Sequence, residues 1–471
     1  MDQNDGGPFE SAMRQHQPVA RLRPGTRVLL TEGSSLSARQ TLYALSYAGA
    51  HVDVCDPAPH SCLARYSRLV GNCYRCPSFT ADPLGYLEFL KEHTRAQAYD
   101  VLFPVHDQVY LLARCRHLFK GTVGLAVPQF ATLERLQSKA QFMRLLAELG
   151  LSHPSTVLVR TRPELERVQS FPCYVKLAYS TAGRGVWLVH DRAQRDQIAD
   201  RLEYDGWLAG DREILVQRPA AGVLRVVQCV FQRGRLVAGH CYQARALGVG
   251  GSARARVSVS DPCVMKQMAA LGGHLRWHGA LTLDYIWDPE TGRPAYIDAN
   301  PRIGETLNAT LSGVNLCAAL VQVALDAPVA ALPPGRQGTR THSAVMSLLA
   351  GAERGASRAS LIVELCRSLM HLGFYAGSQD EMTRPRDDPP SLIPALWLAG
   401  QVLLDPREAS GVIGGAVDNY ALSEGAAGVI RQLGPAAKTR PRGAPIALLS
   451  LPAVARMTGR GPAQALTGTG V

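Results

Sequence analysis

The amino-acid sequence predicts an α/β protein made of several domains, and three observations support this prediction. Residues 27–55 follow the order strand, turn, helix, strand, which is typical of the start of a doubly wound parallel sheet. Two later stretches, 171–189 and 281–308, each contain two short strand patterns joined by turn-forming residues. A chain of 471 residues is also too long for one ordinary core, so roughly two to four domains or subdomains are expected.

The first α/β domain is predicted over residues 25–130, after a polar segment, 1–24, that is predicted to be disordered. Its predicted elements are the strand Arg27–Thr31, the helix Leu36–Ala48 and the strands His51–Cys55 and Asp100–Pro104. His106 and Asp107 follow the last strand at its carboxyl end, where ligands of open α/β sheets gather. This pair is a candidate for the substrate side, although an adjacent His and Asp in a loop more often form only a surface pair.

Lys139 stands in the first turn of a predicted helix whose amino end is capped by Ser138. Gln141 completes a capping box, and Gly150 supplies the left-handed residue that ends the helix. A lysine gains nothing from the positive end of a helix dipole. Its position therefore indicates an anionic partner.

The stretch 171–189 predicts a hairpin with a glycine-rich loop. Lys176 lies between the apolar residues Val175 and Leu177, so its side chain leaves the opposite face of the strand. The small residues of the loop include Ser180, Thr181, Ala182, Gly183 and Gly185. Their bare amides can close over phosphates while the lysine ammonium contacts them. The loop is not a P-loop, because a strand follows it and GxxxxGK[ST] is absent. A glycine-rich hairpin can also be no more than a mobile loop.

A further strand, Glu213–Arg218, ends at a linker that can accept a flat base. Pro219 has no amide to donate, but the carbonyl of Arg218 and the amide of Ala220 remain free to pair with a base edge. The candidate residues of this linker are Gln217, Arg218, Pro219 and Ala220.

The hairpin within residues 281–308 carries two aspartates on facing strands. Asp284 and Asp298 are equidistant from the turn centre near residue 291, so they are predicted to lie opposite one another. Two carboxylates across a ladder repel unless a positive charge lies between them, and a hard divalent cation is the simplest such group. An exposed hairpin with two solvated acids is the alternative.

Strand alternation places the neighbours of Asp298. Asn300 is predicted to share its face, whereas Ile297 and Ala299 take the other face. Asp284, Asp298 and Asn300 are therefore the predicted metal ligands. Arg302 follows Pro301, which bends the chain so that the guanidinium can serve as a rigid fork for an oxyanion.

Composition narrows the class of protein. The net charge is +11, but after Glu424 the chain has no acid, so much of the excess lies in a tail, 431–471, predicted to be basic and disordered.

The eleven cysteines have no paired framework, and Cys73-x-x-Cys76 alone is weak evidence for zinc. Reduced thiols and the lack of a targeting segment predict a cytoplasmic protein, and no apolar run is long enough for a membrane span. The region 331–430 is predicted to be mainly helical.

Taken together, these motifs resemble the ATP-grasp superfamily over roughly residues 25–330. The most specific part is the Asp298-x-Asn300-Pro301-Arg302 strand, paired with an acid 14 residues upstream. The resemblance implies a Rossmann-like pre-ATP-grasp domain, then an ATP-grasp domain over 131–330 in which two α+β subdomains clasp ATP, with the lid subdomain at about 170–220.

The resemblance also implies roles for the nucleotide-binding candidates. Lys139 and Lys176 would hold the α- and β-phosphates, the 180–185 loop would be the lid over the triphosphate, and Gln217–Ala220 would line the adenine pocket. Members commonly place an acid shortly after that linker to bind the ribose hydroxyls, whereas residues 223–225 here are Val-Leu-Arg.

For the reacting centre, the resemblance implies that Asp284, Asp298 and Asn300 coordinate Mg²⁺ (or Mn²⁺) between the β- and γ-phosphates. Arg302, with Arg245, would stabilise the transferring phosphoryl group and the carboxylate that receives it. The implied activity is that of an ATP-dependent carboxylate–amine ligase acting through an acyl phosphate.

Two other functions compete with this ligase. One is a bicarbonate-activating carboxylase or carbamoyl-phosphate-type enzyme, and the other is a non-catalytic ATP-binding module. The expected partners are a small-molecule carboxylate and an amine, with a homodimer as one possibility and neither nucleic acid nor a membrane. Nucleic-acid binding is disfavoured because the basic tail lacks interleaved aromatic residues.

Overall fold

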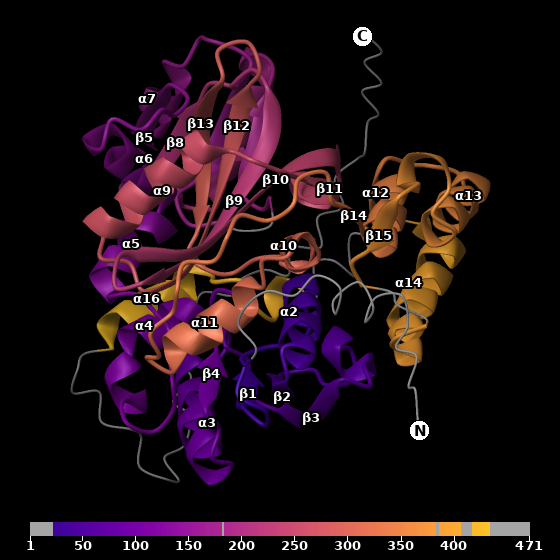
Figure 1. The fold of residues 1–471 in the computed structure, drawn as a ribbon. Helices are drawn as coiled ribbons and strands as arrows, with labels where there is room; N and C mark the ends of the chain where they lie inside the picture. Colours follow the sequence, from indigo (N-terminus) through magenta and orange to yellow (C-terminus); the bar gives the residue numbers. More distant parts are fainter. Residues whose placement is uncertain (1–21, 181–182, 383–385, 407–416, 434–471) are drawn as a thin grey trace, which may run out of the picture. The chain divides into compact units, whose positions relative to one another are not determined.

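The structure is a computed structural model that describes residues 22–180, 183–382, 386–406 and 417–433. Within these residues the strands form three sheets, surrounded by helices (Figure 1). The predicted disordered segments, 1–24 and 431–471, fall mostly outside the described residues. Arg431 is an exception, because it lies in helix α16 (Glu424–Gln432) and its Nε is 2.8 Å from Glu134 Oε1.

The first sheet is parallel and has the strand order β3-β2-β1-β4. The strands are β1 (Arg27–Leu30), β2 (His51–Asp56), β3 (Val70–Arg75) and β4 (Val101–Phe103). The helices beside them are α2 (Leu36–Tyr47), α3 (Pro83–Ala96) and α4 (Gln108–Arg114). Ser35 caps α2 by accepting a hydrogen bond from the Ala38 amide at 3.0 Å. This is the doubly wound start that the sequence predicted.

The second sheet is small and antiparallel, with the order β5-β8-β6-β7. It contains β5 (Thr156–Thr161), β6 (Cys173–Leu177), β7 (Val186–Val189) and β8 (Ala209–Gln217), with helices α7 (Arg162–Glu166) and α8 (Arg192–Tyr204). Helices α5 (Phe130–Gln137) and α6 (Lys139–Glu148) precede it in the chain.

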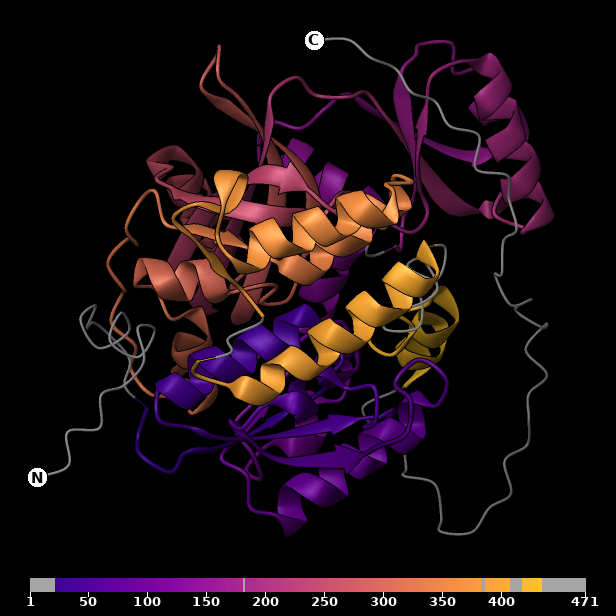
Figure 2. The same ribbon diagram turned by 90° about the vertical axis from the view of Figure 1, so that its right-hand side faces the viewer.

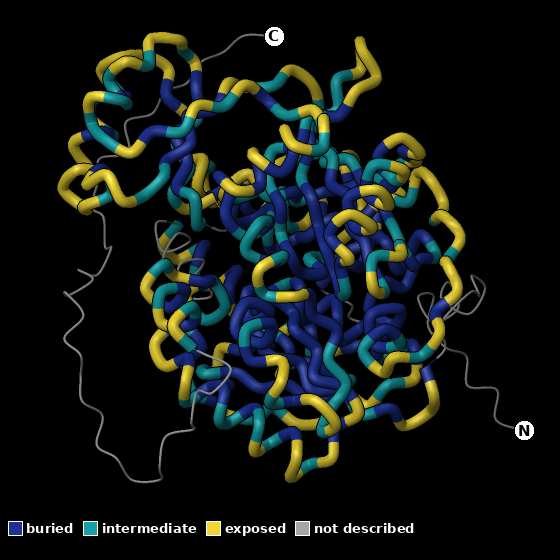
Figure 3. Tube along the Cα trace, turned by 90° about the vertical axis from the view of Figure 1, so that its left-hand side faces the viewer, coloured by how far each residue is buried: buried dark blue, intermediate teal, exposed yellow. Residues whose placement is uncertain are grey.

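The third sheet has seven strands in the order β13-β12-β9-β10-β11-β14-β15. Its long strands are β9 (Val223–Gln232), β10 (Arg235–Leu247), β11 (Ala253–Val259), β12 (Gly279–Asp288) and β13 (Arg293–Asn300). One face packs on α9 (Pro262–His274), and the other on α11 (Leu316–Ala324), which follows α10 (Leu307–Ser312). Buried residues lie in the interior, and exposed ones on the outer loops and helices (Figure 3).

The C-terminal region is not purely helical. Its helices α12 (Ala344–Glu353), α13 (Arg358–Leu369) and α14 (Leu392–Leu404) pack against one another (Figure 2). Two short strands, β14 (Arg340–His342) and β15 (Ser378–Asp380), extend the large sheet at its β11 edge. The region thus continues the central sheet, which the helical pattern of its sequence did not indicate.

Candidate active site

A cavity of about 1320 Å³ is lined by strands of the second and third sheets, by loops and helix residues of the first domain, and by the C-terminal region. The predicted site residues that line it are Lys139, Lys176, Ser180, Gly183, Gln217, Arg218, Pro219, Ala220, Asp284, Asp298, Asn300 and Arg302. Gly185 and Arg245 are not among the described lining residues. Thr181 and Ala182 lie outside the described residues.

Asp284 and Asp298 are paired across β12 and β13, and Thr282 is paired with Asn300. On β12 the side chains alternate, so Leu281 and Leu283 are buried in the core while Thr282 and Asp284 line the cavity. The predicted opposition of the two aspartates is therefore present, and both carboxylates reach one cavity.

Ile297 departs from the predicted alternation, because it lines the cavity together with Asp298. The ladder shifts at this point: Asp284 pairs with Asp298, but the next residue, Tyr285, pairs with Tyr296. One residue of β13 is thus extra, as in a β-bulge, and the bulge places two consecutive side chains on the cavity side. The sequence prediction for Ile297 was wrong because strict alternation assumes an uninterrupted ladder.

Both lysines lie at the charged centre of the cavity. Lys139 Nζ donates to both carboxylate oxygens of Asp298, at 2.6 and 2.7 Å. Lys176 Nζ donates to Gln217 Oε1 at 2.7 Å, and Gln217 Nε2 in turn donates to Thr156 Oγ1 at 3.0 Å. The side chain of Gln217 therefore orients the lysine.

Burial shifts the protonation of this centre. Burial and, to a smaller extent, the neighbouring Asp298 carboxylate raise the pKa of Asp284 to about 7, against the opposing effect of Lys139. Burial, opposed by Asp298 and assisted by Lys139, lowers the pKa of Lys176 to about 8. Such shifts are typical of groups that act on charged ligands.

The side-chain oxygen atoms of this site fit a magnesium ion whose remaining positions are taken by water or phosphate oxygens. Asp284, Asp298 and Asn300 offer carboxylate and amide oxygens, which are the donors that Mg²⁺ takes. Among the described residues there is no group of three or more His, Cys, Asp or Glu side chains able to hold a metal by themselves. Mg²⁺ is commonly bound by one or two carboxylates plus water and phosphate oxygens, so two aspartates suffice.

Arg302 lines the cavity, and its guanidinium is bound by Asp107, which is not a lining residue. The Arg302 guanidinium forms a buried ion pair with Asp107 Oδ1, and the Leu422 amide donates to Asp107 Oδ2 at 2.9 Å. Despite its burial, the pKa of Asp107 lies below its usual range because of Arg302 and His106. Burial lowers the pKa of His106 to about 4, so this ring is neutral near pH 7. The adjacent His-Asp pair is thus not a surface pair.

Arg245 is placed differently from its predicted role. Its guanidinium carbon lies 4.4 Å from the centre of the Phe374 ring, and its Nη2 donates to the Phe374 carbonyl at 3.3 Å. It packs against the C-terminal region rather than lining the cavity.

The end of the cavity next to the linker residues Arg218–Ala220 is apolar. It is lined there by Tyr174, Leu224, Ile286 and Ile297. Arg225 turns away, since its guanidinium carbon lies 4.5 Å from the Trp287 ring centre and its Nη1 is 3.5 Å from Asp261 Oδ2. Residues 223–225 carry no acid, and the one of them that lines the cavity is Leu224.

The glycine-rich loop meets a second glycine-rich segment. Gly183 has φ +74°, and a Cβ added there would lie 2.7 Å from the Gly250 carbonyl oxygen. Arg184 Nη1 is 2.6 Å from Asp418 Oδ1, which joins the loop to the chain before α16. Gly185, with φ +67°, lies against Leu177.

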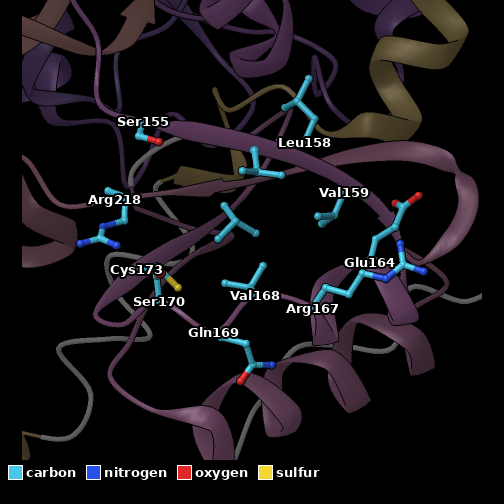
Figure 4. A pocket seen from close by; sticks show the side chains of 12 residues that line it. Ser155, Leu158, Val159, Glu164, Arg167, Val168, Gln169, Ser170, Cys173 and Arg218 are labelled. Atoms are coloured by element: carbon cyan, nitrogen blue, oxygen red, sulfur yellow. The ribbon is translucent and has the colours of Figure 1, made fainter.

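A second pocket, of about 620 Å³, lies in the small sheet and is less suited to chemistry (Figure 4). It is lined by Cys173 and Val216, which point away from the side that Lys176 occupies. Its carboxylate, Glu164, accepts hydrogen bonds from the Arg160 and Thr161 amides at 2.6 and 3.2 Å. That acid therefore stabilises the start of α7.

The sequence analysis singled out Asp107 and Gln217, but not the contacts that they make in the structure. Asp107 binds Arg302 and Gln217 binds Lys176, and these pairs join segments that only the fold brings together. Helix α14 also lines the cavity, at a sequence distance that no local pattern could bridge.

Comparison with known proteins gives a consistent result. No protein-family model matches the sequence. Over 200 residues the chain is 23% identical to the carbamoyl phosphate synthase arginine-specific large chain of Bacillus subtilis. The match covers 40% of this chain and only 19% of that relative.

Three solved structures share the fold. The biotin carboxylase domain of Hydrogenobacter thermophilus 2-oxoglutarate carboxylase, solved with MgADP, ADP and bicarbonate, matches with a TM-score of 0.54 at 13% identity, over 68% of this chain and 74% of that one. Staphylococcus aureus N5-carboxyaminoimidazole synthetase with ADP matches at 0.53 and 12% identity, over 72% and 87%. Aspergillus clavatus carboxyaminoimidazole ribonucleotide synthase with ATP matches at 0.52 and 15% identity, over 68% and 82%.

Proposed function

From the premise that this chain has the ATP-grasp fold, as its structural neighbours show, we propose that it is an Mg²⁺- and ATP-dependent ligase. It activates a carboxylate as an acyl phosphate, and an amine then displaces phosphate to form a carbon–nitrogen bond. A carboxylate is a poor electrophile near pH 7, which is why the reaction consumes ATP.

The cavity residues bind the nucleotide and its metal ion. Lys139 and Lys176 bind the phosphates, and the linker Arg218–Ala220 contacts the base. Asp284, Asp298 and Asn300 would hold the magnesium ion, which supplies charge cancellation on the β- and γ-phosphates.

Arg302 stabilises the transferring phosphoryl group and the acceptor carboxylate. Asp107 fixes the orientation of its guanidinium through the buried ion pair. Arg245 lies against Phe374, so the proposal does not use it.

The observation that carries this proposal is the pairing of Asp284 with Asp298 on a cavity that Lys139 and Lys176 also line. Two facing acids with two cations around them would be a costly arrangement unless it bound a polyanion and its counter-ion.

The test is an Asp298→Asn variant, assayed for Mg²⁺-dependent ADP release across a panel of carboxylic acids and amines. We expect turnover to fall at least about 100-fold, because one metal carboxylate is lost. Asp288→Asn is the matched control: it makes the same change in the same hairpin, at the last residue of β12, which does not line the cavity. Equal turnover of the two variants, with folding verified by circular dichroism, would refute the proposal.

Bicarbonate is the second candidate for the activated acid. One structural neighbour was solved with bicarbonate bound, and the carbamoyl phosphate synthase relative agrees with this alternative. ADP release that requires bicarbonate, and that no organic acid supports, would favour it over the carboxylate–amine ligase.

A further inference from the structure

The cavity is larger than a nucleotide site requires. Its volume of about 1320 Å³ exceeds the roughly 300–1,000 Å³ that is typical of a pocket for one ligand. The part that extends beyond Arg302 leads to the C-terminal region, which the sequence resemblance does not cover.

The wall of this extension is formed by one face of α14. Ile393, Trp397 and Gln401 recur every four residues, and all three line the cavity together with the neighbouring Leu398. Ile393 is 49% exposed and Trp397 57% exposed, so these large side chains face open space rather than the core. Met346 and Leu349 of α12 and Met382 complete the wall.

The apolar wall continues onto the first domain. Leu36 and Leu63 line the cavity and pack against the cluster that contains Leu398 and Met382. Arg302 and the two aspartates line the same cavity as this apolar wall. A guanidinium favours an anion, so the space suits a molecule with a carboxylate at one end and an apolar body at the other.

The apolar wall is fixed to the first domain. Asp388 is fully buried and accepts hydrogen bonds from Arg39 Nη2 and Tyr43 Oη, both at 3.0 Å, and from Ser67 Oγ at 2.7 Å. Arg39 and Tyr43 belong to α2, the helix whose first residues line the cavity. The chain before α14 is thus held against the first domain by a fully buried carboxylate.

We propose that the acid activated by this protein carries a bulky apolar group, which lies against Trp397, Leu398 and Met346 while its carboxylate lies beside Arg302. This inference rests on the proposed function. The reaction is balanced as transfer of the γ-phosphoryl group of ATP to the carboxylate, which releases ADP and leaves an acyl phosphate.

The test measures this step with hydroxylamine as the nucleophile, which displaces phosphate and leaves a hydroxamate. The full chain is given Mg-ATP and a series of straight-chain acids from acetate to decanoate. We expect kcat/KM to rise about fourfold for each methylene that the pocket buries.

Trp397→Ala should remove most of this rise and leave the KM for ATP unchanged. Leu396→Ala is the matched control, because Leu396 is a neighbour on the same helix, is 61% exposed, and does not line the cavity. A preference for small or polar acids, or equal profiles for the two variants, would overturn the inference while hydroxamate formation still supported the proposed function.

A binding readout separates the two proposals. Titration with decanoate should change the tryptophan emission saturably, and Trp397→Phe should abolish that change. If no acid gives hydroxamate but the Trp397-dependent change occurs with decanoate and not acetate, the apolar site stands and the ligase proposal fails. If neither signal occurs, both fail.

Discussion

At the scale of single residues, the chemistry depends on charges that the cavity holds out of water. Lys139 Nζ lies 2.6 Å from Asp298 Oδ1, whereas Lys176 donates to the neutral amide oxygen of Gln217. Burial lowers the pKa of Lys176 to about 8, so this lysine loses its proton more readily than an exposed one.

Lys176 should limit activity at alkaline pH. Burial lowers its pKa to about 8, and only the ammonium form attracts phosphate, so kcat/KM for ATP should fall about tenfold per unit above pH 8. In Lys176→Arg the guanidinium keeps its proton, so this decline should move to higher pH. A wild-type profile that stays level to pH 9.5 would contradict the assignment.

With Leu224 at this position, the protein should discriminate only weakly between ribose and 2′-deoxyribose. The end of the cavity that contacts the base in our proposal presents Leu224, while Arg225 is turned toward Trp287. No acid among the described lining residues there accepts a ribose hydroxyl. A site that makes no hydrogen bond to a hydroxyl cannot strongly reject its absence. We expect kcat/KM for 2′-deoxyATP to lie within about threefold of the value for ATP. A preference for ATP above 100-fold would show that another group binds the ribose.

At the scale of elements, the glycine-rich loop and the segment after β10 meet by close backbone approach. Glycine at position 183 is required twice, by its φ of +74° and by the nearby Gly250 carbonyl. The position of the loop that covers the phosphates in our proposal therefore depends on contact with a second loop.

Gly183→Ala should therefore impair the use of ATP. The added Cβ would lie 2.7 Å from the Gly250 oxygen, so the loop must move, and we expect kcat/KM for ATP to fall about tenfold, equivalent to roughly 1.4 kcal/mol. Gly206→Ala is the control: Gly206 has φ +73° and nothing within 4 Å, so it reproduces the backbone strain without the contact. If both variants lose the same activity, strain alone explains the effect.

At the scale of the whole molecule, buried carboxylates join the C-terminal region to the rest. Glu381 accepts from Gln40 Nε2 at 3.2 Å and from Thr341 Oγ1 at 2.6 Å, and it forms an ion pair with the buried Arg256. Asp388 joins the same region to α2. No helix among the described residues is long and apolar enough to cross a membrane.

Asp388→Ala should destabilise the protein strongly. It leaves the Arg39 guanidinium, which is 1% exposed, without its carboxylate, and an unpaired buried charge typically costs about 3–5 kcal/mol. Urea unfolding would measure the loss. Glu353→Gln, at the exposed end of α12, should change the stability by less than about 0.5 kcal/mol. A similar small loss for Asp388→Ala would show that the anchor is dispensable.

Features that depend on short stretches of sequence were predictable. The turn fixed the register of β12 and β13, so the opposition of Asp284 and Asp298 followed from counting residues. The position of Lys176 followed from alternation along β6, and the cap of α6 from Ser138, which accepts from the Gln141 amide at 3.4 Å. The ATP-grasp fold, inferred from these motifs, was confirmed by the structural neighbours.

Only the tertiary structure decided the features that depend on distant segments. The bulge at Ile297, the ion pair of Arg302 with Asp107, and the placement of Arg245 against Phe374 all arise where separate elements meet. The same holds for Trp397, whose helix has an ordinary apolar sequence. Periodicity tells which face of an element is apolar, but which neighbour covers that face is set by packing and by buried ion pairs between segments hundreds of residues apart.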